Sequence, residues 1–62
     1  MKLKEKREAV GMSQSELANA SGVSVRMIQH YEQGAKDINK AAAITVKKLA
    51  DALNVKMEEI IE

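Results

Sequence analysis

Several residue types are rare or missing in this chain. Its 62 residues include no cysteine, no proline, three glycines and one aromatic residue, Tyr31. Without cysteine there is neither a disulfide framework nor a thiolate metal site, and with one aromatic ring the core must be built from aliphatic residues and alanine. The apolar run from Ala41 to Val46 is far too short to span a membrane, and the first residues lack the apolar region of a signal peptide. We therefore expect no membrane contact and, as the default, a cytoplasmic location.

The chain also has little net charge and few residues suited to catalysis. Its formal net charge is +1 at pH 7. This value neither indicates nor excludes nucleic-acid binding, because phosphate neutralisation depends on where lysine and arginine lie. The one histidine, His30, has no second histidine, cysteine or acidic cluster to act with it, and there is no phosphate-binding loop. These absences leave no constellation for chemistry, so we expect no enzyme activity, no cofactor and no metal site.

The residues that are present predict helices. Leu3, Arg7 and Val10 lie four and three positions apart, as one helical face requires, and Gly11 ends this first helix. The pattern Ser13-x-x-Glu16 is a capping box, which opens a second helix that runs to about residue 20. No segment alternates with the period of two that a strand requires, so the chain is expected to be all-α.

Serine, glycine and asparagine mark the later helix boundaries. Ser24 is placed to cap a third helix and Gly34 to end it. Asp37 or Asn39 caps a fourth helix, and Asn54 tolerates the left-handed conformation that ends it. A short fifth helix closes the chain. The expected helices are 3–10, 14–20, 25–33, a fourth that runs from its cap at residue 37 or 39 to about residue 53, and a fifth near 57–61.

Residues 14–33 meet the steric needs of a helix-turn-helix. Two short helices that cross at about 90–120° over a short turn need a small residue at the crossing, and Ala18 provides it. The turn needs a residue that adopts positive φ, and Gly22 follows four positions later. Apolar residues must flank the crossing, and they are Leu17, Val23, Ile28 and Tyr31.

These segments resemble a known family. The motifs are Ser13-Gln14-x-Glu16-Leu17-Ala18, Ser21-Gly22-Val23-Ser24, Ile28-x-x-Tyr31-Glu32-Gln33-Gly34 and Leu49-Ala50-Asp51-Ala52-Leu53-Asn54-Val55. Together they look like the phage-repressor and Cro type of helix-turn-helix, also called the XRE family. The resemblance covers nearly the whole chain and implies a compact, lambda-repressor-like bundle of five helices. The helix-turn-helix lies at the second and third of these, within a single DNA-binding domain over residues 1–62.

The resemblance makes the third helix, about 24–33, the recognition helix, whose N-terminal residues enter the major groove of DNA. The implied base contacts are Val25, Arg26, Gln29 and His30. Arg26 is the best suited, since its guanidinium can pair with O6 and N7 of guanine. Val25 would contact a thymine methyl and Gln29 an adenine. The alternatives that stay open are a phosphate contact or a solvated surface position for Arg26 and for His30, and a half-exposed position at the helix start for Val25.

The resemblance also implies a set of phosphate contacts. Gln14 lies at the start of the second helix, where free N–H groups and the helix dipole favour an anion. Family members hold a phosphate here and often brace the recognition helix with this residue. The capping serines and the residues after the recognition helix meet the backbone as well, although each is by itself an ordinary polar residue. The implied phosphate contacts are Gln14, Ser13, Ser24, Gln33, Lys36 and Asn39.

Arg7 lies on the apolar face of the first helix, which is an unusual place for an unpaired charge, since a buried charge nearly always has a partner. The resemblance supplies that partner, because family members pair an arginine here with the glutamate at the end of the recognition helix. We therefore expect an ion pair between Arg7 and Glu32 that holds the recognition helix against the first helix.

The C-terminal segment is more apolar than one short helix of a monomer needs. Met57, Ile60 and Ile61 either complete the core together or divide between the core and a dimer patch. Lys56 stands where the family has a capping serine or threonine, and a missing cap destabilises a helix by about 1 kcal/mol.

Two functions of different kinds follow from the resemblance. The first is a sequence-specific transcriptional regulator, a repressor in the simplest case, which binds double-stranded DNA as a homodimer. Its two recognition helices would lie about 34–36 Å apart on a palindromic operator. The second is a protein-interaction module, such as an antitoxin or a coactivator-like bridge, which would bind a protein partner through the surface of the fourth and fifth helices.

Overall fold

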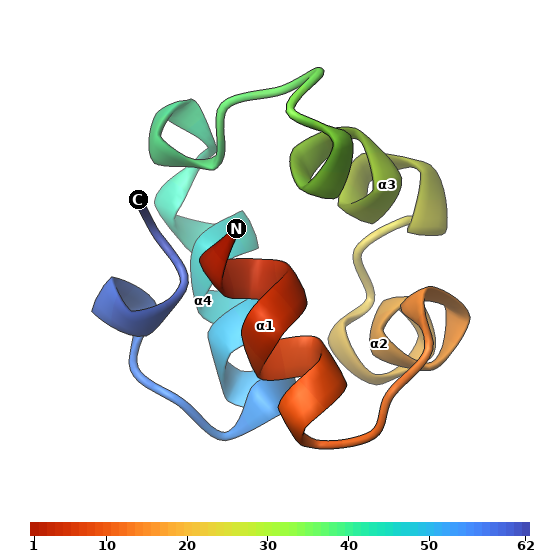
Figure 1. Cartoon of the computed structure of the whole chain (residues 1–62). Helices are drawn as coiled ribbons and strands as arrows, with labels where there is room; N and C mark the ends of the chain where they lie inside the picture. Colours follow the sequence, from red (N-terminus) through yellow and green to blue (C-terminus); the bar gives the residue numbers. More distant parts are fainter.

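The computed structural model describes all of residues 1–62, and every regular element in it is helical (Figure 1). Gly11 and the residues beside it separate the first two helices, and a turn at residues 22–24 joins the second to the third. The α-helices are α1 (Lys2–Ala9), α2 (Gln14–Ser21), α3 (Val25–Gln33) and α4 (Ala43–Leu53). Two single 3₁₀ turns follow α3 and α4, namely η1 (Ile38–Lys40) and η2 (Met57–Glu59).

The expected bundle of five helices is wrong, because the chain has four α-helices. The segment expected as a fifth helix forms only the three-residue turn η2. Its N-cap residue, Lys56, makes no side-chain cap hydrogen bond, since a lysine ammonium has no acceptor to offer a helix N–H group. Glu59 Oε2 does accept from Lys56 N at 2.7 Å. This bond satisfies one N–H group but does not extend the turn into an α-helix.

The fourth helix also begins later than expected. Asp37 Oδ1 accepts from Asn39 N at 2.9 Å, and this local bond caps the turn η1 and not an α-helix. The side chain of Ile38 is 2% exposed, so this turn contributes to the core. The backbone is then extended at Ala41 (φ −69°, ψ 153°) and at Ala42 (φ −58°, ψ 142°). Therefore α4 begins only at Ala43.

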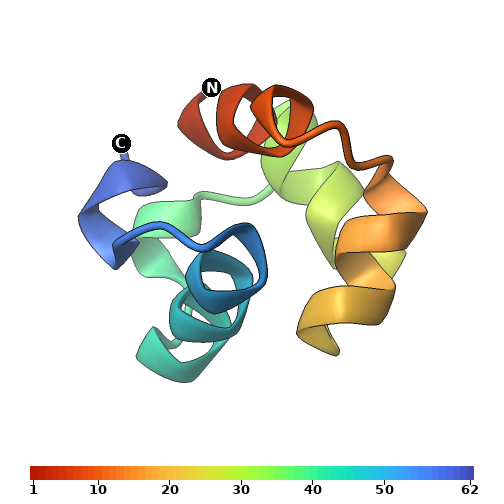
Figure 2. The ribbon, with the colours of Figure 1, turned by 90° about the horizontal axis from the view of Figure 1, so that it is seen from below.

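The helix-turn-helix depends on caps whose geometry is local. Ser24 Oγ accepts from Met27 N at 3.2 Å and so starts α3. Gly22 ends α2 with φ 76°, in the left-handed region, where any side chain would be strained. Across this turn α2 packs against α3, and α2 also packs against α4. Seen from below, α2 and α3 lie on one side of the molecule, and α4 and η2 lie on the other (Figure 2).

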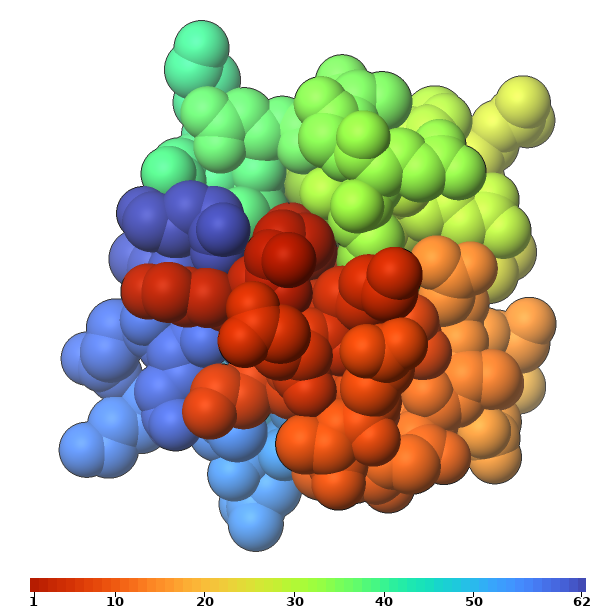
Figure 3. All heavy atoms as spheres, in the orientation of Figure 1, coloured from red at the N-terminus to blue at the C-terminus, as the bar shows by residue number.

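The core is aliphatic except for one ring. In the space-filling view α1 runs across the middle of one face, between α2 and the C-terminal segment (Figure 3). Each α-helix and the turn η1 contribute to the cluster beneath it, and Ile60, which directly follows η2, completes it. The buried apolar residues are Leu3, Leu17, Val23, Ile28, Tyr31, Ile38, Val46, Leu49, Ala50, Leu53 and Ile60. No helix of the structure has the length and apolar character needed to cross a membrane.

Candidate nucleic-acid interface

The outward face of α3 contains the residues expected to contact bases. Ile28 and Tyr31 turn inward and are 0% and 4% exposed. At 100° per residue, Arg26 and Gln33 lie nearly opposite them, and both are exposed. The four residues expected to contact bases differ in how exposed they are. Val25 and Arg26 are exposed, whereas Gln29 and His30 are half-buried beside them.

Arg26 is free to bind a partner outside the chain. The four ion pairs of the structure involve other cations. Three lysines of the following segment, Lys36, Lys40 and Lys48, are exposed and unpaired in the same way. By contrast, residues 49–62 contain four acidic residues and one lysine. The small net charge thus conceals an excess of free cations between residues 26 and 48.

Ser13 is largely committed within the chain. Its Oγ accepts from Glu16 N at 3.0 Å, and its own N–H donates to Glu16 Oε1 at 2.8 Å, which completes the expected capping box. The main-chain N–H of Ser13 is therefore not available to a phosphate. The N–H groups of Gln14 and Ser15 come first in α2, and such groups have no partner within a helix.

The side chain of Gln14 faces the recognition helix. Its Nε2 donates to Glu32 Oε1 at 3.0 Å, across the angle between α2 and α3. One of the two amide protons is thereby used inside the protein. Gln14 braces α3 through this bond, and its main-chain N–H remains the better placed group for an anion at the start of α2.

The polar residues after α3 also differ in whether their side chains have partners inside the protein. Gln33 and Lys36 are exposed. Asn39 is not free, because its side chain pairs with both main-chain groups of Glu62. The expected phosphate contact from the amide of Asn39 therefore has a competing partner inside the protein.

Arg7 and Glu32 form a buried, bidentate ion pair between α1 and α3. Arg7 Nε donates to Glu32 Oε2 at 2.8 Å, and Arg7 Nη2 donates to Glu32 Oε1 at 3.0 Å. The side chains are 10% and 3% exposed. Arg7 Nη1 donates to Met12 O at 2.8 Å. With Gln14, these contacts form one network that joins α1, the α1–α2 turn, the start of α2 and the end of α3.

Met12 is a member of this network that the sequence did not indicate, whereas the family resemblance had implied that Gln14 braces the recognition helix. Met12 takes part through its carbonyl oxygen, which every residue has, so no sequence signal could identify it. The bond from Gln14 depends on the crossing of α2 and α3, which brings residues 14 and 32 together.

The network controls the ionisation of Glu32. Burial raises the pKa of this carboxyl, but the hydrogen bonds from Arg7 and Gln14 and the charge of Arg7 outweigh burial, so the pKa lies below its usual value. The hydrogen bond to Glu32 in turn raises the pKa of Arg7. Both groups are therefore charged at neutral pH.

The lowered pKa of Glu32 predicts loss of stability in acid. The contribution of this carboxylate is fully present above its unfolded pKa, about 4.3, and is lost as the pH falls through the lower, folded pKa. We expect urea titrations to give a lower free energy of unfolding at about pH 3 than at pH 7. Glu32→Gln should reduce this difference without abolishing it, because the pKa values of Glu16 and Glu59 are also lowered. An unchanged difference in Glu32→Gln would contradict the assignment to Glu32.

The C-terminal segment supports a core role more than a dimer patch. Ile60 is 0% exposed and completes the core, so it cannot belong to a surface patch. Met57 and Ile61 are half-buried and pack against the same cluster. The large apolar side chains that are exposed lie elsewhere, and they are Val10, Val25 and Ile44.

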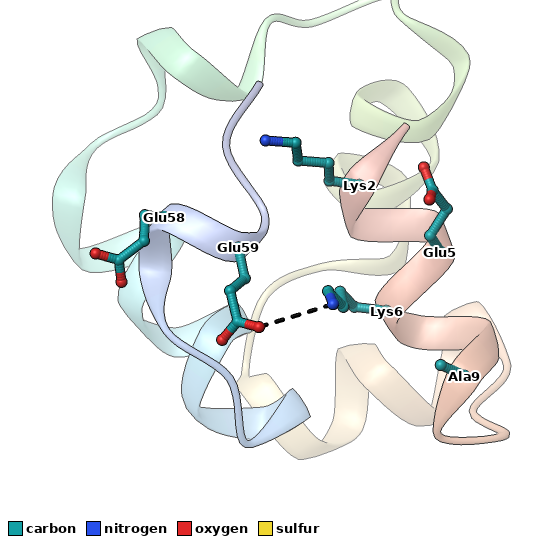
Figure 4. A pocket seen from close by; sticks show the side chains of 6 residues that line it. All are labelled: Lys2, Glu5, Lys6, Ala9, Glu58 and Glu59. Atoms are coloured by element: carbon teal, nitrogen blue, oxygen red, sulfur yellow. Dashed lines mark ion pairs between the residues drawn. The ribbon is translucent and has the colours of Figure 1, made fainter.

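A hollow between α1 and η2 lies apart from the outward face of α3 (Figure 4). Its lining has one apolar residue, Ala9, among charged side chains of both signs. Lys6 Nζ lies 3.7 Å from Glu59 Oε1 across it. Small-molecule sites are mostly apolar with a few placed polar groups, so this hollow lacks the character of a ligand pocket. The lining residues are Lys2, Glu5, Lys6, Ala9, Glu58 and Glu59.

These features define a small domain with a helix-turn-helix, in which α3 is exposed along one face and locked to α1 and α2 along the other. A family model described as "Helix-turn-helix" matches residues 3–60, nearly the whole chain. The chain therefore belongs to the helix-turn-helix family, which confirms the resemblance read from the motifs.

The chain is similar to a protein of Pyrococcus abyssi (strain GE5 / Orsay) named "Putative HTH-type transcriptional regulatory protein". The two are 36% identical over 61 residues, which is 98% of this chain and 19% of that protein. The chain thus spans about a fifth of the length of this relative. No solved structure matches.

Proposed function

We propose that this chain is the DNA-binding part of a transcriptional regulator. In this proposal α3 enters the major groove of an operator, and the chain acts as a repressor. The observation that carries the proposal is that α3 has a free arginine on its outward face and is held in place at its C-terminal end. Its outward face presents Arg26 without an internal partner, whereas its inner end is fixed by the bidentate pair with Arg7. A rigid helix with a free arginine is suited to reading base edges.

Family membership and the name of the relative support the same function. In this proposal Arg26 pairs with a guanine, and Gln29 and His30 contact neighbouring bases from their half-buried positions. The start of α2 and the segment after α3 hold the backbone on either side. Lys36 and Lys40 supply charge there, since both are exposed and unpaired.

A homodimer on a palindromic operator completes the proposal. A domain of 62 residues reads few base pairs, and two copies about 34–36 Å apart read twice as many. The half-buried Met57 and Ile61 and the exposed Val10 and Ile44 are the apolar side chains available for such a contact.

A selection from random double-stranded oligonucleotides tests this function. We expect enrichment of one motif, with half-sites one helical turn apart if the chain binds as a dimer. Affinity for the motif should fall as salt rises, because bound lysine and arginine release counterions. Enrichment of a motif with a single half-site would support sequence-specific binding but contradict the dimer. Binding that depends on salt and ignores sequence would reject base readout by α3.

A protein-interaction module is the second candidate, and one observation favours it. Ile44 is 59% exposed on α4, on the side of the molecule where a protein partner was expected to bind. A single exposed isoleucine is ordinary on a protein surface, so we rank this candidate second. Failure of the oligonucleotide selection to enrich any sequence would favour it.

A further inference from the structure

Glu62 is hydrogen-bonded to the connection between α3 and α4. Asn39 Oδ1 accepts from Glu62 N at 2.8 Å, and Asn39 Nδ2 donates to Glu62 O at 3.2 Å. One amide side chain thus pairs with both main-chain groups of one residue 23 positions away. The two sides of this contact are anchored in the core, since Ile38 is 2% exposed and Ile60 is 0% exposed.

Glu62 also contacts the N-terminal end of α1. Its Oε2 accepts from Lys2 N at 3.2 Å, and α1 has no side-chain cap of its own. The two ends of the chain therefore lie side by side, as Figure 1 shows. The connection carrying Asn39 is held through Glu62 to the first turn of α1.

Asn39 lies in a segment with two free lysines. It lies between Lys36 and Lys40, two exposed lysines that take part in no ion pair. A lysine on a loose loop loses side-chain and backbone freedom when it binds a phosphate, and prior fixation of the loop removes part of that loss. Asn39 uses one of its two amide protons and its amide oxygen in the bonds to Glu62.

We propose that Asn39 is a positioning residue, which uses Glu62 as a strap to hold the α3–α4 connection in the conformation that presents Lys36 and Lys40 to the DNA backbone. Its role in DNA binding rests on the function proposed above. The strap itself belongs to the free protein, so the two can be tested separately.

A double-mutant cycle separates positioning from direct contact. Asn39→Ala and deletion of Glu62 are each expected to weaken binding to the selected operator about fivefold, and the double variant should be no weaker than either. Glu62→Gln is the matched control, because it keeps the main-chain groups that Asn39 uses. Asn19→Ala, at an exposed asparagine of α2, controls for the loss of an amide. If Asn39→Ala weakens the complex and deletion of Glu62 does not, or if the two effects add in the double variant, Asn39 contacts a phosphate directly and the proposal is overturned.

Amide hydrogen exchange in the free protein tests the strap without DNA. The N–H groups of Asn39, Lys40 and Ala41 are hydrogen-bonded inside η1. In Asn39→Ala and in the variant that lacks Glu62, we expect these N–H groups to exchange about fivefold faster than in the wild type. The melting temperature should change little. Unchanged exchange would overturn the strap whatever the DNA result. Faster exchange in a protein that binds no operator would support the strap and reject the proposed function.

Discussion

Replacing Arg7 with methionine is expected to lower the free energy of unfolding by roughly 3–5 kcal/mol. The guanidinium makes a bidentate pair with Glu32, whose side chain is 3% exposed. Without Arg7, Glu32 becomes a buried charge held only by the amide of Gln14. A chain of this length has a total stability of roughly 3–9 kcal/mol. The variant should therefore be close to unfolding, and urea titration followed by helical circular dichroism measures the change.

Lys6→Met is the matched control in the same helix. Lys6 pairs with Glu59 at 3.7 Å, but both side chains are about two-fifths exposed, and such pairs contribute at most about 1 kcal/mol. A double variant, Arg7→Met with Glu32→Met, should recover part of the loss, because no buried charge is left unpaired. Equal stability of Arg7→Met and the wild type would show that the pair contributes nothing to the fold.

Arg26→Ala is expected to weaken binding to the selected operator by about 10- to 100-fold, with little change in stability. The side chain is exposed and has no internal partner, so its removal leaves α3 and its caps intact. Loss of a bidentate contact with guanine should also relax the preference at one position of each half-site. Fluorescence anisotropy on the operator and on its single-base variants measures both effects.

Lys56→Ala is the matched control for the loss of a surface cation. Lys56 is exposed and lies in the acidic C-terminal segment, so its removal should leave operator binding nearly unchanged. If Arg26 binds a phosphate and not a base, the variant weakens binding to all sequences alike and lowers the salt dependence by about one ion. That result would assign base readout to other residues of α3.

The helix-turn-helix could be predicted from residues whose signals are local. Ser13 with Glu16, Ser24, Gly22 and Gly34 act within four positions of themselves, and each cap or left-handed turn has the expected geometry. The third helix has the predicted bounds, Val25–Gln33. The position of Arg7 on an apolar face indicated a buried partner, and the family resemblance named Glu32.

The fifth helix and the start of the fourth were wrong because their signals were read as purely local. A periodic apolar pattern at Met57, Ile60 and Ile61 also suits a single turn that delivers Ile60 to the core. Asp37 does act as a cap, but the burial of Ile38 beside it fixes a 3₁₀ turn and delays α4 to Ala43. In both cases, packing over one turn decided the structure.

Sequence by itself determined the helix-turn-helix and the residues on the outward face of α3, because caps, glycine turns and helical period depend on near neighbours along the chain. Only the tertiary structure decided which polar side chains remain free. Gln14 turns to Glu32 and Asn39 turns to Glu62, across 18 and 23 positions. Such hydrogen bonds arise where folded segments meet, and a pattern of residue types along the chain does not reveal that meeting.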